Sequence, residues 1–202
     1  MALPEIHVVA GRTATATALG PVAQAMRLAG LLVPVLVVAG ADPGAVGTAF
    51  ADLDLVADLT LPAGPAAALL ARFDRMWANR APTAVLVAGS DPAGLSAALA
   101  AAWRGIPVAH LGAGVRSDSA VDGDEADARL ITQVARVHLV AHPVDAMNLL
   151  DEGVPAGDLM ISGDDTLAPR RAAQAVASVA GLAPRPAPMP VTVPPAAVRF
   201  GG

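Results

Sequence analysis

The sequence predicts a doubly wound α/β domain with a mainly parallel sheet. Short apolar runs rich in valine, leucine and isoleucine alternate along the chain with segments of strong helix formers. Most runs are continuous rather than alternating, which is typical of parallel strands covered by helices on both faces. Residues 85–116 give the clearest unit, in which a strand, a tight turn, a helix and a second strand follow one another. We therefore expect one Rossmann-like domain over residues 1–180.

Seven strands are predicted. Residues 5–10 (EIHVVA) form the first, and residues 33–38 are wholly apolar, as in a strand buried inside a sheet. Residues 55–61 partly alternate between apolar and polar, so this strand is placed nearer an edge. The predicted strands are 5–10, 33–38, 55–61, 85–88, 108–111, 137–141 and 159–162.

Seven helices separate or follow these strands, and glycine, proline or a short polar residue bounds most of them. Gly30 ends the first helix and Asp91 precedes the fourth. In the fifth helix, Ala126, Leu130 and Val134 are predicted to face inward. The predicted helices are 17–29, 45–50, 65–79, 93–104, 125–136, 143–152 and 167–179.

The composition excludes several classes of protein. The 202 residues carry a net charge of -5 and no basic stripe, so we expect no nucleic-acid partner. The absence of cysteine excludes disulfides and thiolate metal sites. No apolar run reaches the ~18 residues of a membrane helix, and the first residues, MALPEIHVV, lack the basic start of a signal peptide. We expect no membrane association and a cytoplasmic location.

Residues 181–202 (GLAPRPAPMPVTVPPAAVRFGG) differ from the rest of the chain in being rich in proline. Such a tail is expected to be extended, and either mobile or docked on a neighbouring chain. Val191, Val193, Val198 and Phe200 would be left in water if the tail contacted nothing.

Four segments carry motifs: VVAGRTATA at 8–16, VLVAGSDP to RGIPVAH at 85–110, HLGAGVRSDS at 110–119, and 123–169, which begins GDEADAR. In this order they resemble the G-T-R-P-E loop, the V-x-V-x-G-D-x-x-[ST] and R-I-P-V-x-H unit, the H-x-E-A-G-x-R-[ST] segment and the P-E-E-x-N-R helix of the non-hydrolysing UDP-N-acetylglucosamine 2-epimerases. The resemblance implies one half of a glycosyltransferase-B fold, because that family has two domains with the active site between them.

The resemblance also implies acid–base chemistry. Epimerisation at C2 removes a proton and returns one to the opposite face, so at least two placed acid or base groups are needed. Ser90 and Gly112 stand where the family has an aspartate and a glutamate. Glu125 matches a family glutamate and is the first catalytic candidate; the alternative is an ordinary first-turn glutamate. Asp91, next to the lost aspartate, is the second candidate, and its alternative role is a helix N-cap.

Six residues are candidates for ligand binding. Arg12 and Arg116 match family arginines and are expected to hold phosphate oxygens; the alternative for each is a surface ion pair. His110 either contacts the ligand or is a core histidine with a backbone partner. The candidates are Gly11, Arg12, Ser90, His110, Gly112 and Arg116.

No cofactor or metal is expected. Asp118, Asp122 and Asp124 lack the spacing of metal ligands, so a solvated loop is the preferred interpretation. The chain has no G-x-G-x-x-G after its first strand and no Walker motif, so the sequence does not indicate NAD or ATP.

Two functions stay open. The first is a catalytically reduced protein that serves as a nucleotide-sugar-related binding or partner subunit. The second is an active nucleotide-sugar 2-epimerase that works with a separately encoded second domain. In both cases we expect a UDP-sugar ligand and a homodimer, or a heteromer with a sugar-active protein. Four alanines of the fourth helix are expected to pack against a partner: Ala97, Ala98, Ala101 and Ala102.

Overall fold

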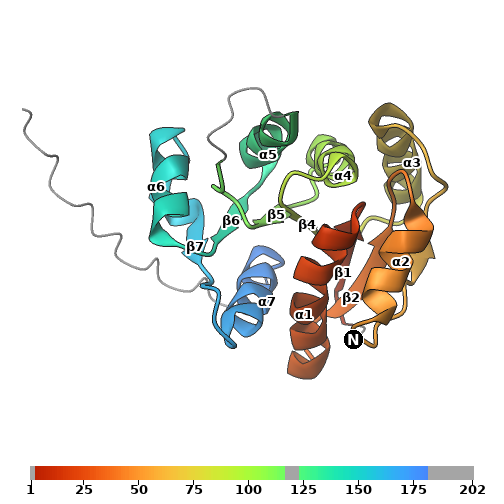
Figure 1. Ribbon diagram of the computed structural model, residues 1–202, viewed down its shortest axis with the longest axis horizontal. Coiled ribbons are helices and arrows are strands. Elements are labelled where there is room, and N and C mark those ends of the chain that lie inside the picture. The colour runs from red at the N-terminus through yellow and green to blue at the C-terminus, as the bar shows by residue number, and fades with distance from the viewer. Residues whose placement is uncertain (1–2, 117–122, 182–202) are drawn as a thin grey trace, which may run out of the picture.

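The computed structural model describes residues 3–116 and 123–181, and its strands form one parallel sheet (Figure 1). The strands are β1 (Glu5–Ala10), β2 (Val33–Val38), β3 (Leu59–Thr60), β4 (Ala84–Ala88), β5 (Val108–Leu111), β6 (Val137–Val140) and β7 (Leu159–Ile161). Their order across the sheet is β3-β2-β1-β4-β5-β6-β7, and every pair is parallel. The predicted doubly wound α/β class is confirmed.

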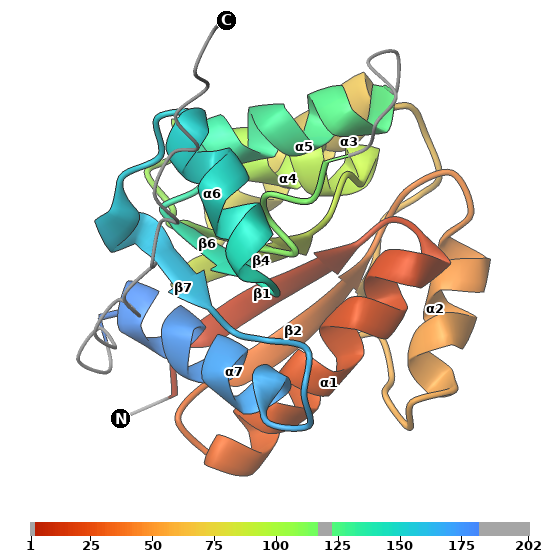
Figure 2. The ribbon, with the colours of Figure 1, turned by 60° about the vertical axis from the view of Figure 1, so that its left-hand side comes forward.

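Helices cover both faces of the sheet, as Figure 2 shows. One layer holds α1, α2 and α7, and the other holds α3, α4, α5 and α6. The helices are α1 (Thr13–Ala29), α2 (Pro43–Ala51), α3 (Ala66–Asn79), α4 (Pro92–Trp103), α5 (Gly123–Val134), α6 (Pro143–Asp151) and α7 (Ala168–Val179), with a 3₁₀ turn at Ala156–Asp158. None of the helices in the described ranges is long and apolar enough to cross a membrane.

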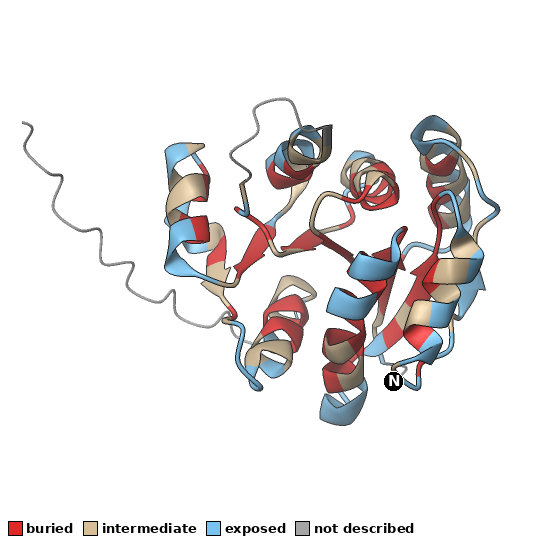
Figure 3. Cartoon of the chain, in the orientation of Figure 1, coloured by how far each residue is buried: buried red, intermediate tan, exposed pale blue. Residues whose placement is uncertain are grey.

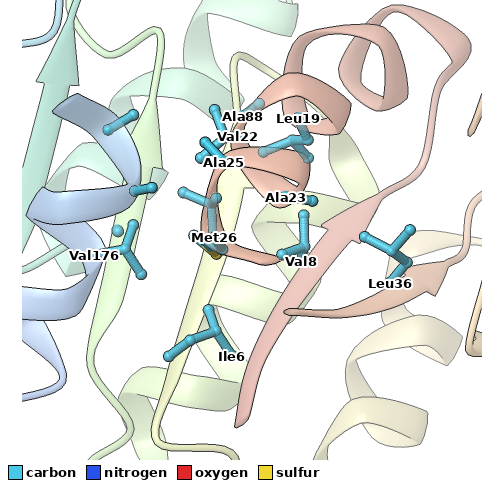
Figure 4. Packing of buried hydrophobic residues seen from close by; sticks show 14 of the residues in the cluster. Ile6, Val8, Leu19, Val22, Ala23, Ala25, Met26, Leu36, Ala88 and Val176 are labelled. Atoms are coloured by element: carbon cyan, nitrogen blue, oxygen red, sulfur yellow. The ribbon is translucent and has the colours of Figure 1, made fainter. Parts of the chain in front are cut away.

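The largest group of buried side chains lies between the sheet and α1, α2 and α7. In Figure 4, Leu19, Val22 and Met26 of α1 face the strands, and Val176 of α7 lies beside them. These positions repeat at three- and four-residue intervals, so one stripe of α1 is buried while its other side meets solvent. Figure 3 shows the same division on the neighbouring helices, with buried residues toward the sheet.

Helix α4 has a larger share of buried residues than a helix at the protein surface. Ala97, Ala98 and Ala101 have no exposed area and belong to the core beneath α3 and α5, and Ala102 is half-buried. The prediction that this alanine face packs against a partner chain is therefore wrong, because the chain's own helices already cover it. A helix that is apolar on all sides is typical of such an interior position.

Helix α5 is turned relative to the prediction. Ala126 and Leu130 are exposed and Val134 is half-buried, whereas Ile131 and Thr132 are buried. Two apolar stripes were available on this short helix, and α5 buries the one that meets α4 and β5. The proline-rich tail, apart from Gly181, lies outside the described residues, as do Asp118 and Asp122.

Candidate functional site

A cleft of about 520 Å³ opens at the carboxyl ends of β1, β4 and β5. The strand order reverses between β1 and β4, and open α/β sheets bind ligands at such a reversal. Five of the predicted site residues line this cleft: Arg12, Ser90, Asp91, Gly112 and Glu125. The fold thus brings together five of the eight site residues that the sequence predicted.

Asp91 joins two loops beneath the cleft. It is the N-cap of α4, and its carboxylate accepts hydrogen bonds from the backbone N–H of Ala93 (2.9 Å) and of Gly11 (2.5 Å). The Thr15 hydroxyl, 2.8 Å away, is the third donor. With 2% of its surface exposed, Asp91 ties the end of β1 to the start of α4. The N-cap alternative for this residue is confirmed.

Gly11 is required by this contact. A Cβ atom at this position would lie 2.4 Å from both Asp91 Oδ1 and Ala93 Cβ, which is too close for any side chain. The glycine thus allows a backbone–carboxylate contact that no other residue type permits. It lies behind the cleft wall and supports Asp91.

Arg12 stands on the rim of the cleft and forms a two-pronged ion pair with Asp124 of α5. The two N–O distances are 2.6 and 2.8 Å, and both side chains are about two-fifths exposed, at 42% and 43%. The hydrogen bond from Arg12 lowers the pKa of Asp124, whereas burial and the Asp124 charge raise the pKa of Asp127. The guanidinium that was predicted to hold phosphate is thus engaged by a carboxylate.

Glu125 lies in the first turn of α5 and lines the same cleft. Its Oε1 accepts hydrogen bonds from Arg129 Nε (3.1 Å) and Nη2 (2.8 Å), one helical turn along. A glutamate paired in this way is held in place near the N-terminus of its helix. It is the residue that the sequence motifs predicted as the first catalytic candidate.

Gly112 and His110 come from β5 and the loop after it. Gly112 has a φ of +71° with open space around its Cβ direction, so its backbone conformation requires glycine. His110 is fully buried, and its Nε2 lies 2.8 Å from the Gly89 carbonyl oxygen, which can only accept. Burial lowers the pKa of His110 to about 4. The alternative of a core histidine with a backbone partner is confirmed.

Arg116 lies away from the cleft lining. Its Nε and Nη2 donate to the two carboxylate oxygens of Glu152 at 2.8 and 2.6 Å, and the side chains are 12% and 19% exposed. This hydrogen-bonded contact lowers the pKa of Glu152. Arg116 thus forms an ion pair, as the alternative interpretation predicted, but this pair is more buried than an ion pair on the protein surface.

Sequence reasoning missed Thr15 and the exposed Val115, both of which line the cleft. Thr15 was assigned to a loop because the predicted helix started at residue 17, whereas α1 starts at Thr13. Within the described ranges, no three acidic or histidine side chains are grouped so as to hold a metal ion.

Comparison with known proteins shows similarity to UDP-N-acetylglucosamine 2-epimerases. A family model described as UDP-N-acetylglucosamine 2-epimerase matches residues 44–177. A "Probable UDP-N-acetylglucosamine 2-epimerase" of Ralstonia nicotianae is 33% identical over 89 residues, which are 43% of this chain and 24% of that protein. The UDP-N-acetylglucosamine 2-epimerase of Neisseria meningitidis is 31% identical over 88 residues, with the same shares covered.

Solved structures show the same fold. The S. aureus MnaA–UDP structure matches with a TM-score of 0.75 at 20% identity, over 80% of this chain and 45% of that one. The Methanocaldococcus jannaschii UDP-GlcNAc 2-epimerase in complex with UDP-GlcNAc and UDP matches with a TM-score of 0.72 at 20% identity, over 79% and 46%. This chain thus spans less than half the length of these relatives. Since the family model matches well over half of its residues, the chain belongs to the UDP-N-acetylglucosamine 2-epimerase family.

Proposed function

We propose that this chain is a catalytically reduced member of its family that contacts a UDP-sugar as a binding or partner subunit. The ligand is inferred from relatives whose structures hold UDP or UDP-GlcNAc. We assign such a ligand to the cleft at the strand reversal, because this cleft is open at the carboxyl edge of the sheet.

The proposal of reduced catalytic activity rests on which acidic residues are present around the cleft. Ser90 and Gly112 line it at two positions where the family has a carboxylate. Asp91 is committed to three hydrogen bonds within the protein, so it cannot take over as a free base. Loss of one placed acid or base group typically costs about 10²–10⁴ in rate, and two are missing here.

Proton exchange at C2 of UDP-N-acetylglucosamine tests this proposal. The full chain is incubated with the nucleotide sugar in deuterated buffer, and the C2 proton signal is followed by NMR. We expect no loss of that signal beyond a protein-free control. Exchange that disappears in the matched variant Glu125→Gln would overturn the proposal, because it would show that Glu125 still removes a proton.

A second candidate is an active epimerase completed by a separately encoded domain. Three aliphatic side chains favour it: Val115, Val144 and Leu167 are 58%, 59% and 52% exposed. They follow β5, β6 and β7, so all three lie at the edge of the sheet where the cleft opens. Exposed apolar side chains at this edge are more stable in contact with a second protein than in contact with water.

Reconstitution distinguishes the two candidates. A separately encoded chain that resembles the second half of these epimerases is mixed with this chain, and C2 exchange is measured again. The active-enzyme candidate requires exchange that needs both chains and Glu125. Absence of exchange, with the two chains shown by light scattering to associate, would exclude that candidate and leave the partner role.

A further inference from the structure

We propose that the Asp91 carboxylate is a built-in anion that fills the anion-binding position at the strand reversal. The phosphate groups of a nucleotide sugar are therefore not held at the β1–α1 turn of this chain. The consequence for the ligand rests on the proposed function, whereas the occupied anion position follows from the geometry alone.

The three donors around Asp91 come from two different helices. Gly11 and Thr15 belong to the turn that starts α1, and Ala93 belongs to the first turn of α4. Backbone N–H groups and the helix dipole make such N-termini attractive to anions. Here one carboxylate accepts from both starts at distances of 2.5, 2.8 and 2.9 Å.

The packing leaves no room for a second anion at that position. Asp91 is 2% exposed, and its Oδ1 lies 2.4 Å from where a Cβ of Gly11 would be. The carboxylate therefore presses directly against the β1–α1 turn. A phosphate group could reach the same donors only if the Asp91 side chain left them.

The remaining charges of the cleft also disfavour a diphosphate. Among the described residues, its lining has one arginine, Arg12, against three carboxylates: Asp91, Asp124 and Glu125. Arg12 already donates to both oxygens of Asp124. A diphosphate would add negative charge to a lining that is negative on balance. The described part of the cleft thus suits the uncharged hydroxyl and amide groups of the sugar better than the diphosphate.

The test is rescue by an external anion. In Asp91→Ser the serine hydroxyl still caps α4, but the space facing Gly11 and Thr15 is vacated. We expect a lower Tm for this variant. Formate at 100 mM, compared with chloride at equal ionic strength, should raise it by about 3–6 °C if formate binds with a dissociation constant near 10 mM. The wild-type protein should not respond.

Asp42→Ser is the matched control. Asp42 is also the N-cap residue before a proline, but within the described ranges its carboxylate accepts from Ala45 of its own helix and from no other element. Formate should therefore leave the Tm of this variant unchanged. Equal responses of the two serine variants, or no rescue of Asp91→Ser, would overturn the proposal.

A measurement on the wild-type protein covers the case in which Asp91→Ser does not fold. Inorganic pyrophosphate is titrated into ¹⁵N-labelled protein, and the amide signals of Gly11 and Ala93 are followed. We expect both to stay in place up to 10 mM, and a saturable shift of either would refute the proposal. Neither test contains a nucleotide sugar, so their outcome is independent of whether the chain binds one.

Discussion

Two of the arginine–carboxylate pairs among the described residues allow a matched test of what burial does to an ion pair. Each pair has two hydrogen bonds with N–O distances of 2.6–2.8 Å; Arg116 donates to Glu152 through Nε and Nη2, and Arg12 to Asp124 through Nη1 and Nη2. The first pair is 12% and 19% exposed, and the second 42% and 43%. We expect Arg116→Met to destabilise the protein more than Arg12→Met, since methionine keeps an apolar stem and removes only the charged group.

The expected size follows from these exposures. Breaking a buried pair costs about 3–5 kcal/mol, and breaking an exposed pair about 0.2–1 kcal/mol. Arg116–Glu152 lies between these limits, so we expect about 2 kcal/mol for Arg116→Met and less than about 1 kcal/mol for Arg12→Met. In a protein of this size these losses correspond to about 4–8 °C and less than about 4 °C in Tm.

Thermal unfolding of both variants followed by circular dichroism measures the difference, and its pH dependence identifies the cause. The pair holds the pKa of folded Glu152 below its ordinary value of 4.5. Its contribution is therefore fully present above about pH 4.5 and is lost as the pH falls through the lower pKa of the folded protein. Equal losses for Arg116→Met and Arg12→Met at pH 7 would refute the reasoning, as would a difference that persists unchanged at pH 3.

Three further predictions concern the backbone, the histidines and assembly. Gly114→Ala should cost about 1–3 kcal/mol more than Gly112→Ala in denaturant unfolding, because a Cβ at Gly114 would lie 2.2 Å from a backbone oxygen while Gly112 faces open space; equal costs would contradict this. Between pH 6.5 and 5 the free energy of unfolding should fall by about 2 kcal/mol for each of His110 and His138, whose pKa is about 4, since the unfolded chain binds protons that the folded one does not. A free energy of unfolding that calorimetry finds unchanged between pH 6.5 and 5 would contradict this prediction. We also propose a homodimer, and a single 20.0 kDa species in light scattering at micromolar concentration would rule that out.

The sequence was sufficient for the sheet because its strands are covered on both faces. Residues 5–10, 33–38 and 108–111 were placed as the structure has them, since a continuous apolar run between turn residues admits few other assignments. The edge strand was predicted over 55–61, but β3 spans only Leu59–Thr60. Leu55 is buried without belonging to a strand, so its apolar character gave a false signal.

The positions of the site residues were predicted better than the residues that they contact. The motifs, and positions directly after predicted strands, placed Arg12 and Asp91 at one edge of the sheet. Their hydrogen bonds join residues 112 and 80 positions apart, and no local pattern specifies such pairs. Arg116 shows the same limit, because it lies in the loop after β5 and its partner Glu152 lies at the end of α6, 36 positions away.

The position of β1 in the interior of the sheet has a consequence for folding during synthesis. This strand is hydrogen-bonded to β2 on one side and to β4 on the other. During synthesis β2 follows soon after it, but the second side of β1 has no partner until Ala84–Ala88 has left the ribosome. Contacts between residues so distant in sequence slow folding, and an unpaired strand edge invites association with other chains. The nascent protein is therefore expected to be most prone to aggregation while its sheet is half made, before Asp91 can reach back to Gly11.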